Sequence, residues 1–146
     1  IGEWIPPLPG GFTAGLSAVG GLHPGDESRL FSVFDSPAAG AICYEIADGR
    51  SLALAAAEGA DWLLSIANLD PYPSQLQQQF LALAQLRAIE SGRDLLSVAN
   101  TGPTALISAD GHVDRLLPTM EAGLATVTVQ RRETMTFYSW LVSKSR

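Results

Sequence analysis

Two strand-like segments separated by a helix-like segment constrain the fold of this chain more than any other feature. Residues 39–44 are small and apolar, residues 50–58 are rich in alanine, and residues 62–67 are almost continuously apolar. Continuous apolar runs are typical of strands in a parallel sheet, which is covered on both faces. Strand, helix and strand in this order predict a β-α-β unit, and we therefore expect an α/β fold.

The chain continues with one long helix and several strands. Residues 74–91 predict a helix that begins with a capping box of Ser74 and Gln77 and ends at Gly92. Further strands are expected at residues 30–34, 94–99, 103–108, 112–117 and 123–129. Residues 1–24 are rich in glycine and proline and are expected to form a loop.

Composition indicates one folded domain and excludes several functions. The chain has 146 residues, of which 47% are hydrophobic and 16% are charged, as expected of a protein with a core. A net charge of -6 argues against a nucleic-acid partner, which would need a basic surface. Two histidines without a carboxylate at ligand spacing make a poor metal site, so no metal or cofactor is expected.

The single cysteine, Cys43, lies near the end of the first apolar segment of the predicted unit. Alternation along a strand would place Cys43 and Glu45 on one side of the backbone and Tyr44 on the other. A thiol at the carboxyl end of a parallel strand lies where open α/β sheets form their crevice, so Cys43 is a candidate nucleophile. Most cysteines without a disulfide are small buried apolar residues, and that alternative stays open.

A cysteine nucleophile reacts as the thiolate, which needs a neighbouring cation, base or helix dipole. Glu45 has the wrong charge, and the only lysine, Lys144, lies in the tail. His23 lies in the glycine-rich segment and His112 beside a hairpin turn, so we expect no Cys–His dyad. We therefore expect no cation beside Cys43. It is either structural or activated by a group outside these residues.

Five blocks of sequence occur in the same order as in a known family. They are residues 2–6, 42–45, 59–68, 86–90 and 99–105. Together they resemble the apolipoprotein N-acyltransferases of the nitrilase, or carbon–nitrogen hydrolase, superfamily, and the loop at 68–73 is similar to the cyanobacterial branch. The resemblance implies the α-β-β-α sandwich of that superfamily, here about its second half. Residues 1–133 would be the C-terminal part of the catalytic domain, and residues 134–146 a membrane-proximal tail.

The resemblance also implies acyl transfer on the periplasmic side of a bacterial inner membrane. Cys43 would take a fatty acyl group from a phospholipid as a thioester and give it to the N-terminal amine of a diacylglyceryl lipoprotein. Glu45 and Glu3 match two glutamates that support the family's site. The family's base Glu, its oxyanion-stabilising Lys and its flanking membrane helices have no match here, so we expect this chain alone to be inactive.

Three further residues are expected to bind substrate or to support the site. Tyr44 adjoins the nucleophile. Asn68 matches an asparagine of the family's active-site loop, with turn capping as the alternative. Arg87 lies on the apolar stripe of the long helix, where an ion pair with a structural glutamate is favoured over catalysis. Many members have a tryptophan in the loop after Asn68, but this chain has Pro71-Tyr72 there, so that role is not carried over.

Two other functions stay open. The chain could be an amidase of the same superfamily, which gives the acyl group to water, or a non-catalytic α/β domain in which Cys43 only packs. The aromatic segment at 134–144 favours the acyltransferase, because aromatic residues and a cation fit a membrane interface. A helix that caps the domain is an equally consistent interpretation of that segment.

Overall fold

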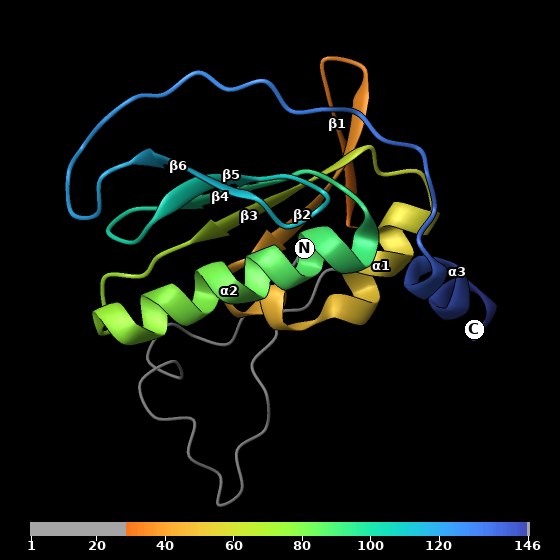
Figure 1. The fold of residues 1–146 in the computed structure, drawn as a ribbon, viewed down its shortest axis with the longest axis horizontal. Helices are drawn as coiled ribbons and strands as arrows, with labels where there is room; N and C mark the ends of the chain where they lie inside the picture. Colours follow the sequence, from red (N-terminus) through yellow and green to blue (C-terminus); the bar gives the residue numbers. More distant parts are fainter. Residues whose placement is uncertain (1–28, 146) are drawn as a thin grey trace, which may run out of the picture.

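The strands between residues 29 and 145 form one mixed sheet whose order follows the sequence (Figure 1). The computed structural model describes residues 29–145. Its strands are β1 (Leu30–Val33), β2 (Ser36–Ile42), β3 (Trp62–Ala67), β4 (Leu95–Ala99), β5 (Thr104–Ile107) and β6 (Val113–Leu117). β2, β3 and β4 are parallel, whereas β1, β5 and β6 join through antiparallel pairs. The predicted α/β fold is confirmed.

Helices α1 (Gly49–Ala57) and α2 (Ser74–Ser91) connect the parallel strands and cover one face of the sheet, and a third α-helix, α3 (Phe137–Lys144), packs beside α1 (Figure 1). The 3-10 helix η2 (Cys43–Ala47) precedes α1. η2 and α1 lead from β2 to β3, so the predicted β-α-β unit is confirmed. Asp48 caps α1, because its Oδ1 accepts a hydrogen bond from the amide of Ser51 at 3.1 Å.

The hydrophobic core lies between this face of the sheet and the helices α1 and α2. Alternate residues of the strands point into this core. The strand residues include Ala39, Ala41, Leu63 and Leu95, and the helix residues in the same buried cluster include Leu52, Phe80, Ala84 and Ala88. Leu63 and Leu95 are completely buried. Burial of each such leucine stabilises the fold by about 1.5–3 kcal/mol.

The other face of the sheet carries exposed apolar side chains. Ile42, Ile66 and Val98 are neighbours in the register of β2, β3 and β4, and they are 41%, 50% and 36% exposed. Parallel strands are normally covered on both faces, because their sequences are apolar on both. The described residues therefore form one sheet and one helical layer of the predicted α-β-β-α sandwich.

The long helix α2 has the predicted bounds but a different N-cap. It runs from Ser74 to Ser91, and its C-cap is Gly92, whose φ of 64° is the left-handed conformation that glycine favours. The N-cap is Pro73, and the predicted capping box is wrong. Gln77 instead donates its Nε2 to the carbonyl oxygens of Leu69 and Tyr72, at 3.0 Å each. It therefore holds the loop that precedes the helix.

An extended segment of residues 118–136, the linking segment, joins β6 to α3 (Figure 1). The strand predicted at 123–129 is wrong. An alternating sequence favours an extended backbone, but a strand also needs a neighbour with which to form a ladder. Among the described residues, the backbone–backbone bonds of this segment lie near its two ends, from Met120 N to Thr101 O and from Arg132 N to Asp61 O, both at 3.2 Å.

Two consecutive buried charges anchor the end of the linking segment. Asp94 accepts hydrogen bonds from Ala109 N at 3.1 Å, Gln130 N at 3.0 Å and Arg132 Nε at 3.0 Å. Arg93 donates to carbonyl oxygens of α1, of residue 60 and of residue 134. Burial lowers the pKa of Arg93, and the charge of Asp61 opposes that shift. The two charges tie the segment to the ends of α1 and α2.

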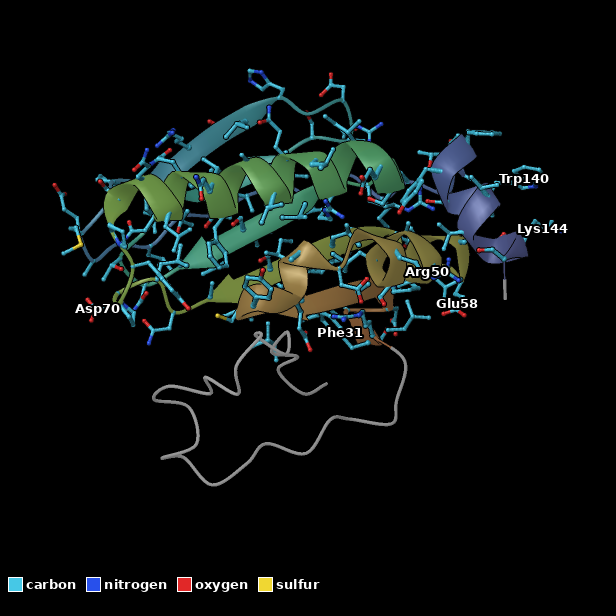
Figure 2. The ribbon with its side chains drawn as sticks, turned by 90° about the horizontal axis from the view of Figure 1, so that it is seen from below. Phe31, Arg50, Glu58, Asp70, Trp140 and Lys144 are labelled. Carbon is cyan, nitrogen blue, oxygen red and sulfur yellow. The ribbon has the colours of Figure 1, made fainter. Side chains whose placement is uncertain are left out.

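The aromatic segment near the C-terminus forms α3, which packs mainly on α1. Thr136 caps it by accepting a hydrogen bond from Ser139 N at 3.0 Å. One side of α3 is buried, whereas Trp140 and Lys144 project away from the sheet (Figure 2). The interpretation of this segment as a helix on the domain surface is confirmed. No helix between residues 29 and 145 is long and apolar enough to cross a bilayer.

Candidate active site

The carboxyl ends of β2, β3 and β4 meet at one edge of the sheet. Cys43 follows β2, Asn68 follows β3, and Asn100 follows β4. The register pairs Ile42 with Ile66 and Ala67 with Ala99. The residues that follow the three strands, Cys43, Asn68 and Asn100, therefore lie in a row along that edge. This is the edge at which parallel α/β sheets form their functional crevices.

Cys43 lies on a strained turn. β2 ends at Ile42, and Cys43 is the first residue of η2, with a φ of 51°. The expectation that Cys43 and Glu45 share one side of a strand is therefore wrong, because the chain leaves the strand at Cys43. A residue other than glycine in the left-handed region costs roughly 1–3 kcal/mol, and such strain persists only where surrounding contacts hold it. The half-buried Cys43 is thus presented by a fixed turn at the end of the strand.

Glu45 supplies one of the contacts that hold this turn. Its side chain is 3% exposed, and its Oε2 accepts a hydrogen bond from Ile42 N at 2.9 Å. The same oxygen lies 3.0 Å from Nη1 of Arg29. The carboxylate thus folds back beneath the turn and receives two donors on a single oxygen atom.

Arg29 is a cation that sequence reasoning missed. Its Nη1 also donates to Gly40 O at 3.3 Å, and its Nη2 lies 3.6 Å from Oδ2 of Asp48. The cation lies against the carboxylate two residues after the cysteine, a contact that the sequence did not indicate. Antiparallel pairing of β1 with β2 brings Arg29 next to Gly40, whose amide donates to the carbonyl oxygen of Arg29 at 3.1 Å. The only sequence signal is an arginine directly before a strand that pairs with the strand carrying Cys43.

Asn68 and Asn100 form an amide pair at the same edge of the sheet as the cysteine. Asn100 Nδ2 donates to Asn68 Oδ1 at 2.7 Å, and Asn68 Oδ1 also accepts from Asp70 N at 3.2 Å. Asn100 Oδ1 accepts from the amides of Leu69 and Thr101, both at 2.9 Å. The turn-capping interpretation of Asn68 is confirmed. Asn100 was missed as a site candidate, although both asparagines directly follow parallel strands.

The other predicted residues lie in different surroundings. Tyr44 is 39% exposed within η2. Arg87 is buried on α2, and its Nη1 lies 3.0 Å from Glu90 Oε2, so the predicted ion pair with a glutamate is confirmed. Glu3, His23 and the loop predicted at 1–24 lie outside the described residues. Within residues 29–145, no three His, Cys, Asp or Glu side chains gather as metal ligands.

The sheet and its helices have the fold of the nitrilase superfamily. Nit3 of Saccharomyces cerevisiae, a member of that superfamily, superposes with a TM-score of 0.58 at 15% identity, over 68% of this chain and 40% of its own. An amidase from Nesterenkonia sp. AN1 superposes with a TM-score of 0.55 at 20% identity, over 69% of this chain and 41% of its own. One structure of that amidase carries acrylamide added to its active-site cysteine.

The sequence identifies the family directly. A model of the carbon–nitrogen hydrolase family matches residues 4–137, and the chain belongs to this family. It is 68% identical over 142 residues to the apolipoprotein N-acyltransferase of Parasynechococcus marenigrum strain WH8102, covering 97% of this chain and 30% of that protein. The corresponding enzyme of Prochlorococcus marinus strain MIT 9313 is 55% identical over 139 residues, covering 95% of this chain and 28% of that protein. The chain therefore spans about 30% of the length of these relatives, and the predicted resemblance is confirmed.

Proposed function

We propose that this chain is the cysteine-bearing part of an apolipoprotein N-acyltransferase and that Cys43 is its acyl-carrying nucleophile. The identity of 68% to such an enzyme over nearly the whole chain supports the assignment. The observation that carries it is the position of Cys43 on a left-handed turn, at the strand end and above the buried Glu45. A side chain that only packs would not require a strained turn at this edge.

The proposed reaction has two steps. The Cys43 thiolate attacks an ester carbonyl of a phospholipid, and the tetrahedral intermediate expels the lysophospholipid alkoxide, which takes up a proton. The resulting thioester is attacked by the N-terminal amine of a diacylglyceryl lipoprotein, which loses a proton and releases the thiolate. Glu45 and Glu3 support the site, and Tyr44 and Asn68 line or hold it. A base Glu and an oxyanion-stabilising Lys would come from the remainder of the protein, so we expect the isolated chain to be inactive.

The division of the chain follows from this assignment. Residues 1–133 would belong to the catalytic domain, and residues 134–146 would form a membrane-proximal tail on the periplasmic side of the inner membrane. Phe137 and Trp140 stack with ring centroids 5.8 Å apart and are 75% and 46% exposed, and Lys144 follows in the last turn of α3. Aromatic residues beside a cation favour the interface between lipid and water, which supports this placement.

The test uses the complete protein and a phospholipid with a labelled acyl chain. Mass spectrometry after digestion should find the acyl group on the peptide that contains Cys43, and a diacylglyceryl peptide should remove it. Cys43→Ala should abolish both signals, and Tyr138→Phe in the distant helix α3 should leave them intact. Full transfer by the Cys43→Ala protein would refute a nucleophilic role. Release of the acyl group to water, with none on the peptide, would favour the amidase alternative.

A further inference from the structure

We propose that Arg29 is a positioning residue for Cys43, which acts through Glu45 to fix the turn and to offset the negative charge beside the thiol. This inference rests on the proposed role of Cys43 as the nucleophile. Arg29 lies outside the described elements, directly before β1.

The contacts of Arg29 bracket Cys43 on both sides. Before the cysteine, Nη1 donates to the carbonyl oxygen of Gly40 on β2 at 3.3 Å. After it, Nη1 binds Glu45 Oε2 at 3.0 Å, and Nη2 lies 3.6 Å from the N-cap residue of α1, Asp48. One guanidinium group therefore links the strand before the turn to the two segments that follow it.

The link reaches the peptide that leads into Cys43. Glu45 Oε2 accepts the hydrogen bond of Ile42 N at 2.9 Å, and the same oxygen receives Arg29. If Arg29 is removed, the carboxylate loses the donor that fixes its orientation, and the turn loses its support. Because Cys43 has a φ of 51°, this turn is the part of the edge that depends most on such support.

Arg29 also offsets a buried negative charge. A carboxylate that is 3% exposed needs a partner, because a buried, unpaired charge is strongly unfavourable. Two residues from that carboxylate, the thiol must ionise in order to react, and an uncompensated negative charge would oppose this. Arg29 offsets the charge of Glu45. Asp48 is the other carboxylate near Arg29, and its oxygens also accept hydrogen bonds from Ser51.

The geometry favours arginine over lysine at this position. The guanidinium reaches a carbonyl oxygen and two carboxylates at once through two of its nitrogen atoms. A planar fork with several fixed donors suits such an arrangement, whereas an ammonium group supplies one point charge. Arg29→Lys should therefore retain the charge effect and lose part of the positioning.

The experiment compares variants of the complete protein by two readouts. The first is the rate of labelling of Cys43 by phospholipid, resolved into kcat and KM. The second is the rate at which iodoacetamide alkylates Cys43, measured by mass spectrometry without any lipid. The variants are Arg29→Met, Arg29→Lys, Glu45→Gln and the double variant Arg29→Met/Glu45→Gln. Arg115→Met is the matched control, because Arg115 is exposed on β6 and binds Gln78 of α2 at 2.9 Å.

Arg29→Met should lower kcat by about 10-fold to 100-fold, with a smaller change in KM, because a misplaced nucleophile slows the chemical step. Iodoacetamide alkylation should also slow, and Arg29→Lys should restore part of its rate. The double variant should alkylate faster than Arg29→Met, because glutamine leaves no uncompensated charge and still accepts the Ile42 amide. A merely structural arginine would not give that recovery.

The outcomes separate this inference from the proposed function. Alkylation and acylation at wild-type rates in Arg29→Met would overturn the inference. Equal losses of the alkylation rate in Arg29→Met and in the double variant would overturn the charge effect. If the wild-type protein forms no acyl adduct but alkylation still depends on Arg29, the proposed function fails and the inference stands. If Arg29→Met does not fold, the comparison of Arg29→Lys with Arg115→Met decides, and equal rates would overturn the inference.

Discussion

Gly49 at the start of α1 lies directly against the guanidinium of Arg87 on α2. A Cβ atom placed on Gly49 would be 1.4 Å from Nη1 of Arg87 and 2.7 Å from Oε2 of Glu90. Because glycine has no Cβ atom, the buried Arg87–Glu90 ion pair can occupy the space beside Gly49. Gly49 follows Asp48, which caps α1 and lies near Arg29. The ion pair thus supports the helix that begins just after the cysteine turn.

We expect Gly49→Ala to lower the free energy of unfolding by about 1–3 kcal/mol, because the methyl group would overlap a buried ion pair. Denaturation followed by tryptophan fluorescence measures the change. The double variant Gly49→Ala/Arg87→Met provides the control. If the contact is the cause, Gly49→Ala should cost less in the Arg87→Met background than in the wild type. If Gly49→Ala lowers the free energy of unfolding equally in both backgrounds, the contact is not the cause.

Asn100→Ala should loosen the loop after β3. The variant loses the acceptor of the Leu69 and Thr101 amides and the donor to Asn68, and each such bond contributes about 0.5–1.5 kcal/mol. Hydrogen exchange of the Leu69 amide should accelerate. Asn68→Ala is the matched control, because it removes the bonds of Asn68 to Asp70 and to Asn100 Nδ2 but leaves Asn100 Oδ1 free to accept from Leu69. Unchanged exchange at Leu69 in Asn100→Ala would refute this role.

Asp94→Asn should free the end of the linking segment. The Asp94 carboxylate accepts hydrogen bonds from Ala109 N, Gln130 N and Arg132 Nε. The amide of an asparagine at this position would turn its NH2 group, which cannot accept, toward at least one of these donors. Trypsin should then cleave faster after Arg131 and Arg132 than in the wild type. Asp114→Asn on β6, where the side chain is exposed, is the control. Equal cleavage rates in the two variants would show that Asp94 does not hold the segment.

Ile66→Thr should have opposite effects in two contexts if a second layer covers the exposed face of the sheet. In the isolated chain it removes an exposed apolar group that is 50% accessible, and size-exclusion chromatography should show less aggregation. In the complete protein the same residue would be buried, and thermal unfolding should show a lower melting temperature. An unchanged melting temperature would indicate that the face is not covered.

The sequence predicted those features that depend on residues close together in the chain. The bounds of α2 follow from apolar periodicity and from Gly92, and the β-α-β unit follows from two continuous apolar segments around an alanine-rich helix. Cys43 was predicted near the end of a strand of residues 39–44, whereas β2 ends at Ile42 and Cys43 begins η2. Its left-handed backbone was not predicted, because contacts distant in sequence hold that conformation.

The features that were not predicted depend on tertiary contacts. Arg29 and Glu45 are 16 positions apart, and only the pairing of β1 with β2 brings them together. Residues 123–129 have a strand-like pattern, but alternation does not show whether a neighbouring strand is present. The pairing of Asn100 with Asn68 requires the register of β3 with β4, which the sequence does not specify.

The packing of α3 on α1 has a mechanical consequence for the cysteine turn. Arg50 of α1 donates to Oγ and to the carbonyl oxygen of Ser145, at 2.9 and 3.2 Å. Arg50 is only two positions after Asp48, the residue that faces Arg29. A displacement of the chain at Ser145 would therefore reach the first turn of α1 and, through Asp48, the guanidinium of Arg29.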